Sequence, residues 1–187
     1  MNADRELVDA VLADVPGAFV RLVRAHQNLC RHLIQRLVRD PEDVRDLCQE
    51  TFLRVHRTLH QYRGESALGT WIGRIAWNIA VRHLERKRIP LAEPARDGRP
   101  ELLEQVADRV DVESDAIDDE ATALLHQAIE RLPPVQRAVL TLHHLDELPV
   151  AEIAVVTGLA EGTIKSHLYR SRAQLRQLLQ TRIGVCP

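Results

Sequence analysis

Apolar residues recur at intervals of three and four along most of the chain, which is the spacing of one face of an α-helix. This period predicts helices over residues 4–13, 18–38, 41–59, 71–88, 118–131, 134–145, 150–157 and 162–179. Aliphatic side chains are plentiful and aromatic ones scarce, so the core should consist of Leu, Val, Ile and Ala. We therefore expect an all-α protein.

Several helix boundaries carry their own local signals. Asp40 is a favourable N-cap and Pro41 suits the first helical position, where its missing N–H is not needed. Pro134 and Pro149 mark two further starts in the same way. Gly158 follows the helix 150–157 at a position where a helix end often requires a positive φ.

The last two predicted helices, joined by a tight turn at Gly158, have the pattern of a helix-turn-helix. The second of them gathers its apolar residues in one sector, namely Ile164, Leu168, Leu175, Leu178 and Leu179. Lys165, Ser166, Tyr169 and Arg170 fall roughly opposite, and no acidic residue follows Glu161. A small and basic outer face suits a DNA major groove, whereas the plainer alternative is an amphipathic hairpin with a solvated basic face.

Charge divides the chain into three parts. Residues 1–90 carry a net +4, residues 91–130 a net −9 and residues 131–187 a net +3. Pro90, Pro94, Gly98 and Pro100 open the acidic part. We expect two small helical domains, residues 1–89 and 119–187, joined by an acidic, flexible linker over residues 90–118. Basic blocks flanking an acidic one suggest two modules that face nucleic acid.

The remaining composition narrows the class of protein. The three cysteines are far apart and form no CxxC pair, so no disulfide framework is expected. Neither a signal peptide nor an apolar run of membrane-spanning length is evident, so we expect a cytoplasmic protein with no direct membrane insertion.

The first predicted domain contains two candidate binding features. Asp43, Asp46 and Glu50 line one side of the helix 41–59, which indicates a solvated face or a face for a basic partner. The loop 60–70 places Tyr62 beside Arg63, a pairing that suits stacking on a single-stranded base. A metalloenzyme using these carboxylates and the histidines is a weak alternative, because arginines interrupt the row and no matching ligand helix is present.

Two motif sets in this order resemble the extracytoplasmic-function (ECF) group of bacterial RNA polymerase sigma factors. The first is DPEDVRDLCQETFLRVHR followed by YRGESALGTWIGRIAWNIAVRHL, and the second is LPPVQRAVLTLHHLDELPVAEIAVVTGLAEGTIKSHLYRSRAQLR. The resemblance covers the chain from about residue 18 to residue 180. His56, Leu68, Trp77 and His167 depart from the usual pattern, which leaves the promoter sequence open.

The resemblance implies three binding surfaces. The coiled coil of the polymerase β′ subunit would be contacted by Asp43, Asp46, Gln49 and Glu50. The −10 promoter element would be met by Tyr62, Arg63, Gly64, Ser66, Trp71, Arg74 and Asn78. The −35 element would be met by Lys165, Ser166, His167, Tyr169 and Arg170.

The function implied is that of a dissociable subunit that directs core RNA polymerase to promoters. Its partners would be core polymerase, through the β′ coiled coil and the β flap, promoter DNA, and an anti-sigma factor that is often membrane-tethered. It would be no enzyme and would use no cofactor and no metal. The alternative is a LuxR-type regulator that binds DNA without polymerase, although it would leave residues 40–88 unexplained.

Overall fold

The computed structural model describes residues 2–87 and 118–183, which form α-helices, one 3₁₀ turn and their connections without a β-strand. The elements are α1 (Asn2–Leu12), α2 (Ala18–Leu37), α3 (Pro41–Thr58), η1 (Leu59–Gln61), α4 (Leu68–Arg86), α5 (Asp118–Glu130), α6 (Pro134–His144), α7 (Val150–Thr157) and α8 (Glu161–Ile183). This confirms the all-α prediction. The predicted linker lies, except for Asp118, outside the described residues.

The local signals act as expected at most helix ends. Asp40 accepts hydrogen bonds from the backbone N–H groups of Glu42, at 2.9 Å, and Asp43, at 3.4 Å, so it caps α3. Gly158 adopts φ 76° and closes α7, and its N–H donates to the carbonyl of Ala154. The helix 150–157 therefore has the predicted bounds.

The main departure is the start of α4, which begins at Leu68 rather than Trp71. Ala67, at the N-cap position, offers no side-chain acceptor to the free N–H groups of the first turn. Asp4 of α1 provides one instead, because its Oδ2 accepts a hydrogen bond of 2.9 Å from the N–H of Leu68. Leu68 itself is fully buried, so tertiary packing extends the helix into the predicted loop.

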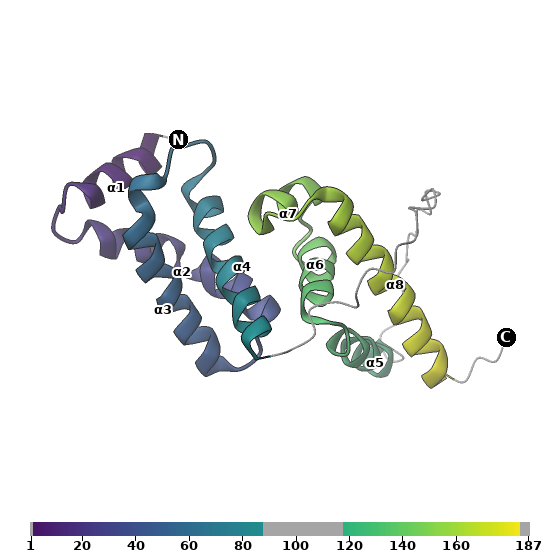
Figure 1. Cartoon of the computed structure of the whole chain (residues 1–187). Helices are drawn as coiled ribbons and strands as arrows, with labels where there is room; N and C mark the ends of the chain where they lie inside the picture. Colours follow the sequence, from purple (N-terminus) through teal and green to yellow (C-terminus); the bar gives the residue numbers. More distant parts are fainter. Residues whose placement is uncertain (1, 88–117, 184–187) are drawn as a thin grey trace.

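The helices form two groups that lie against each other, α1–α4 and α5–α8 (Figure 1). Helices α2, α3 and α4 pack together in the first group, while α5, α6 and α7 pack against α8 in the second. Between the groups, α2 contacts α6 and α4 contacts α7. None of the described helices combines the length and the apolar character needed to cross a membrane.

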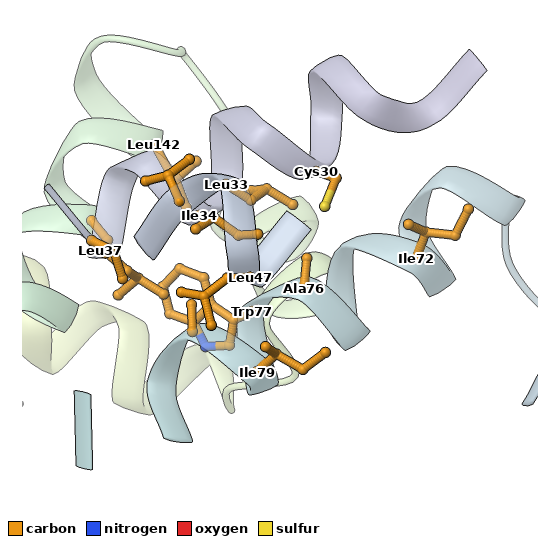
Figure 2. Close-up of a cluster of buried hydrophobic side chains, with 14 of the residues drawn as sticks. Cys30, Leu33, Ile34, Leu37, Leu47, Ile72, Ala76, Trp77, Ile79 and Leu142 are labelled. Carbon is orange, nitrogen blue, oxygen red and sulfur yellow. The ribbon is translucent and has the colours of Figure 1, made fainter. Parts of the chain in front are cut away.

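The two groups share one hydrophobic core. Figure 2 shows Leu142 of α6 beside Leu33, Ile34 and Leu37 of α2, and all four side chains are at most 1% exposed. Helix α6 is buried on every side over residues 135–142, including the polar side chains of Gln136 and Arg137. A helix with an amphipathic sequence becomes buried all round here because α2 covers the face that the second group leaves open.

Candidate functional site

The face of α3 predicted to bind polymerase is exposed at three of its four positions. Asp46, Gln49 and Glu50 all lie on the solvent side of the helix, while Val44, Leu47 and Thr51 are buried on its inner side. Arg45 lies 3.8 Å from Asp46, but both side chains are more than 70% exposed, so this ion pair contributes little. The face therefore offers free acceptor groups to a partner.

Asp43 differs from the other three because α4 already engages it. Its Oδ2 accepts a hydrogen bond of 2.6 Å from Nζ of Lys87, and Nε2 of His83 lies 3.3 Å away without making a hydrogen bond. The hydrogen bond from Lys87 is the main reason that the pKa of Asp43 is lowered. Asp43 thus ties α3 to the end of α4, and its polymerase contact stays a prediction that this geometry does not favour.

The loop after η1 is held in shape by Tyr62. Its hydroxyl donates a hydrogen bond of 2.6 Å to the carbonyl oxygen of Ser66, and its ring lies 5.7 Å from that of Trp71 at 59°. Gly64 turns the chain between them with φ 74°, a conformation that glycine adopts without steric cost. Arg63 is exposed at the tip of the loop. Burial raises the pKa of Tyr62, so the phenol stays protonated and keeps this hydrogen bond.

Asp4 is a residue that sequence reasoning missed. Nothing in the short helix 4–13 indicates a role beyond packing, yet Asp4 caps α4 at the edge of the Tyr62–Ser66 loop. Burial is the main reason that the pKa of Tyr62 is raised, and the charge of Asp4 adds to this rise. Burial lowers the pKa of His26, and the charge of Asp4 partly offsets that change. Residues separated by 64 positions meet here, so no local sequence signal could have revealed the contact.

Helix α4 carries Trp71 and Asn78 along a groove that it forms with α3, whereas Arg74 lies outside this groove, close to Gly158 at the end of α7. Trp71 and Asn78 line one stretch of this groove, and Glu50 lines the next. Arg54, Ile79 and Arg82 belong to both stretches. The surface predicted to bind polymerase therefore adjoins the surface predicted to bind the −10 strand, and two arginines line both.

The outer face of α8 has the expected character. Lys165 and Ser166 are exposed, Tyr169 is 62% exposed and Arg170 is half-buried. Ile164 and Leu168 fix this orientation because they are buried against the rest of the second helix group. Four of the five predicted −35 residues thus share an accessible surface of suitable chemistry for a major groove.

His167 is the fifth predicted residue, and it points inward. Its side chain is only 8% exposed, its Nδ1 has no hydrogen-bond partner, and burial lowers its pKa, so the ring is neutral near pH 7. Its position was readable from spacing, since it lies three residues after Ile164 and four before the fully buried Ser171. We leave His167 out of the proposed DNA surface.

The metal-site alternative gains no support in the part of the chain that the structure describes. Within residues 2–87 and 118–183, no three His, Cys, Asp or Glu side chains gather in a way that could hold a metal ion. His143 instead bonds through Nδ1 to the carbonyl of Leu148, at 2.9 Å, and so helps to fix the turn after α6.

Comparison with known proteins supports the interpretation of both helix groups. The family model for Sigma-70 region 2 matches residues 22–89, and the model for Sigma-70, region 4 matches residues 122–175. Among solved structures, CnrH in complex with the cytosolic domain of CnrY has a TM-score of 0.60 at 22% identity, covering 96% of this chain and 98% of that one. The sigma factor RpoE in complex with the anti-sigma factor NepR from Bartonella quintana has a TM-score of 0.56 at 22% identity, covering 88% and 98%. At these identities the likeness shows a shared fold.

Curated relatives match over nearly the whole chain. The RNA polymerase sigma-H factor of Pseudomonas aeruginosa is 35% identical over 181 residues, which cover 95% of this chain and 94% of the relative. The ECF RNA polymerase sigma factor SigM of Mycobacterium tuberculosis is 33% identical over 178 residues, covering 95% and 85%. With both regions matched in order and relatives of this identity, the chain belongs to the ECF group of RNA polymerase sigma factors.

Proposed function

We propose that this sigma factor divides its work between its two helix groups, with residues 1–89 docking on core polymerase and reading the −10 element and residues 119–187 reading the −35 element. The observation that supports the double role of the first group is the groove between α3 and α4, whose two adjoining stretches share Arg54, Ile79 and Arg82 and link Glu50 to Trp71 and Asn78. One surface can therefore hold the polymerase and the promoter strand together.

Docking would use the exposed carboxylate face of α3. Asp46, Gln49 and Glu50 present acceptors to a basic partner, for which the family resemblance indicates the β′ coiled coil. Because these groups are solvated in the free chain, pairing them with Arg or Lys of a partner adds specificity and speeds association. The second helix group would meet the β flap.

At the −10 element the protein would capture an unpaired base. The Tyr62–Ser66 loop is already shaped by the hydroxyl bond of Tyr62 and by Trp71, so it loses little freedom on binding. Stacking of a base on an aromatic side chain contributes about 1–3 kcal/mol, which offsets the cost of taking one base out of the duplex. Arg54, Arg82 and Asn78 would then hold the adjoining backbone.

At the −35 element α8 would enter the major groove. Lys165 and Arg170 can reach phosphates or guanine edges, while the small side chain of Ser166 permits close approach. Each element is bound weakly alone, and linking the two readers on one chain raises the effective concentration of the second contact.

The protein acts in this proposal by binding and positioning, and it carries out no catalysis of its own. Since its partner is the transcription machinery, we expect it in the cytoplasm. The two structural neighbours were each solved in complexes, one with an anti-sigma factor and one with the cytosolic domain of CnrY. We propose that this chain is likewise controlled by an anti-sigma factor that binds it.

Two substitutions separate the roles. Glu50→Lys should reduce retention of core polymerase in a pull-down and leave −35 DNA binding intact, with Glu6→Lys at an exposed position of α1 as the matched control. Arg170→Ala should leave the pull-down unchanged and cost about 1–3 kcal/mol of discrimination at one −35 position if it reads a base. Arg21→Ala, an exposed arginine of α2, is its control.

Run-off transcription from a promoter library provides the functional readout. Selective initiation that depends on both elements is the expected result for the wild type. If Glu50→Lys and Arg170→Ala lose the same step, the proposed division of roles is wrong. Tight duplex binding without any retention of core polymerase would instead favour the LuxR-type alternative.

A further inference from the structure

Two of the three cysteines meet inside the first helix group, although they lie on different helices. Cys30 of α2 is completely buried, and Figure 2 shows it on the same helix as Leu33 and Ile34 of the core. Cys48 of α3 packs against this core but stays partly exposed. Helices α2 and α3 are in direct contact, and the two thiols form a hydrogen bond across that contact. The packing of the group therefore contains a pair of thiols with one member at the surface.

The hydrogen bond makes the two sulfur atoms unequal. The S–H of Cys30 donates to the sulfur of Cys48, which is the main reason that the pKa of Cys30 is raised and that of Cys48 lowered. Burial raises the pKa of Cys30 further. For Cys48, partial burial opposes the fall in pKa and the charge of Arg31, an exposed residue, supports it. Since the thiolate is the reactive form of cysteine, Cys48 is the nucleophile of the pair and Cys30 stays a protonated thiol beside it.

Neither a metal site nor ordinary packing accounts for the pair. Structural zinc sites use four ligands, and among the residues that the structure describes no three His, Cys, Asp or Glu side chains gather to hold an ion. Packing explains Cys30, because a free cysteine often behaves as a small hydrophobic side chain. It does not explain a second, partly exposed cysteine that is hydrogen-bonded to the first.

Cys48 belongs to the part of α3 that carries the face predicted to bind polymerase. It lies between Leu47, which is buried, and Gln49, which is exposed and precedes Glu50 on that face. An S–S bond is about 2.05 Å long and restricts the torsion between the two side chains that it joins. Its formation from a hydrogen-bonded pair must draw α3 toward α2 at this level, which would displace the side chains next to Cys48.

The reaction needs an oxidant, for which a hydroperoxide such as hydrogen peroxide suffices. The Cys48 thiolate attacks one peroxide oxygen, the O–O bond breaks, and the departing hydroxide takes up a proton to leave as water, so that Cys48 becomes a sulfenic acid. The Cys30 sulfur then attacks the Cys48 sulfur, the S–O bond breaks, and hydroxide leaves as water with the Cys30 proton. The two cysteines lose two electrons and two protons in total, and the peroxide is reduced to two molecules of water.

We propose that Cys30 and Cys48 form a peroxide-sensitive dithiol whose disulfide weakens docking of the α3 face on core polymerase. In the cytoplasm, where we expect this protein, the disulfides that do form are usually transient and often serve redox sensing. The oxidised chain is returned to the dithiol by a reducing dithiol, which is itself oxidised to a disulfide. The effect on docking rests on the proposed function, whereas formation of the disulfide is a property of the free chain.

Peptide mapping of the full chain tests the site directly. Trypsin cleaves after arginine, so Cys30 and Cys48 fall in separate peptides, residues 25–31 and 46–54. After treatment with hydrogen peroxide and blocking of the free thiols, non-reducing mass spectrometry should show these two peptides joined, and dithiothreitol should separate them. The third cysteine, Cys186, lies in the peptide 183–187, so a disulfide that involves it has a different mass.

Two single variants test which sulfur reacts first. In Cys30→Ala the sulfenic acid on Cys48 has no partner, so dimedone, which traps sulfenic acids, should label the peptide 46–54. In Cys48→Ala dimedone should label the peptide 25–31 about tenfold less, because Cys30 is buried and protonated. Circular dichroism checks the fold of both variants, and the peptide mapping of the wild type depends on neither.

Retention of core polymerase in a pull-down measures the consequence. Catalase removes the peroxide before polymerase is added, so that only the sigma factor is oxidised. The oxidised wild type should be retained about threefold less than the reduced protein, because the polar groups beside Cys48 are displaced, and dithiothreitol should restore retention. Cys48→Ala should be retained equally with and without peroxide.

Failure of each part is distinguishable. Peptides 25–31 and 46–54 that stay unlinked in the peroxide-treated wild type would overturn the site, as would linkage mainly through Cys186 or dimedone labelling confined to Cys30. Linked peptides with unchanged retention would overturn the effect on docking. If the reduced wild type does not bind core polymerase at all, the proposed function is wrong, while the peptide data still decide whether the disulfide forms.

Discussion

Substitution of Asp4 tests whether α1 caps α4 and so stabilises the start of that helix beside the Tyr62–Ser66 loop. The N–H of Leu68 is one of the four in the first turn of α4 that lack an intrahelical acceptor, and Asp4 is its partner at 2.9 Å. Removing a capping side chain costs about 0.5–2 kcal/mol, and the carboxylate adds about 0.3–1 kcal/mol through the helix dipole. Asp4→Ala should therefore lower the free energy of unfolding by about 1–3 kcal/mol.

Asp4→Asn separates the two contributions, because the amide oxygen can still accept the hydrogen bond but the charge is gone. We expect it to lose only the dipole contribution of about 0.3–1 kcal/mol. Urea unfolding followed by circular dichroism measures the free energy of unfolding of both variants. In thermal unfolding, a loss of 1 kcal/mol corresponds to a fall of about 2–4 °C in melting temperature for a chain of this size.

Asp9→Ala is the control, since Asp9 is an exposed acid on the same helix. If Asp4→Ala destabilises the protein no more than Asp9→Ala, the cap does not form in solution. In that case the extension of α4 to Leu68 would need another cause, and burial of the Leu68 side chain would be the remaining one.

Three further predictions follow from single residues. Gly158→Ala should cost about 1–2 kcal/mol in thermal unfolding, because φ 76° is strained for alanine, whereas Gly162→Ala at an exposed position of α8 should not destabilise. Burial lowers the pKa of His167, so on acidification the unfolded chain takes up a proton before the folded chain does. The free energy of unfolding should therefore fall as pH drops below about 6.5. His167→Gln should flatten that fall when stability is measured by urea unfolding at a series of pH values. The pKa of Asp43 is lowered, so this carboxylate stabilises the folded chain at pH values above its ordinary pKa near 3.8, and the stabilisation is lost at more acidic pH. Lys87→Met should raise the pKa of Asp43, which an NMR titration would measure.

Helices and their ends were predictable because their causes are local. Asp40 with Pro41, and Gly158 after Thr157, carry the chemistry of a cap and of a positive φ in the residues themselves. The spacing of His167 from Ile164 places it beside the buried stripe, whereas the resemblance to the family motif predicts it on the DNA surface. For this residue the period is the better guide.

The features that were not predictable depend on residues far apart in the chain. Asp43 belongs to a carboxylate row by spacing, but Lys87 of another helix engages it. Asp146 lies in a polar turn that reads as ordinary solvent-facing sequence, yet it meets Arg36 at a separation of 110 residues. A periodic pattern identifies which face of a helix is apolar, and it leaves open what will cover the opposite face.

The burial of α6 on every side has a consequence for genetics. Residues 135–142 lie away from the surfaces proposed for DNA and for the β′ coiled coil, but each is packed by neighbours on some side. Substitutions there, such as Leu140→Ala, remove buried contacts and cost about 2–5 kcal/mol, enough to lower the amount of folded protein in a cell. A screen for inactive alleles would thus place its densest cluster on α6, and only a measurement of protein abundance would distinguish those alleles from losses of promoter or polymerase binding.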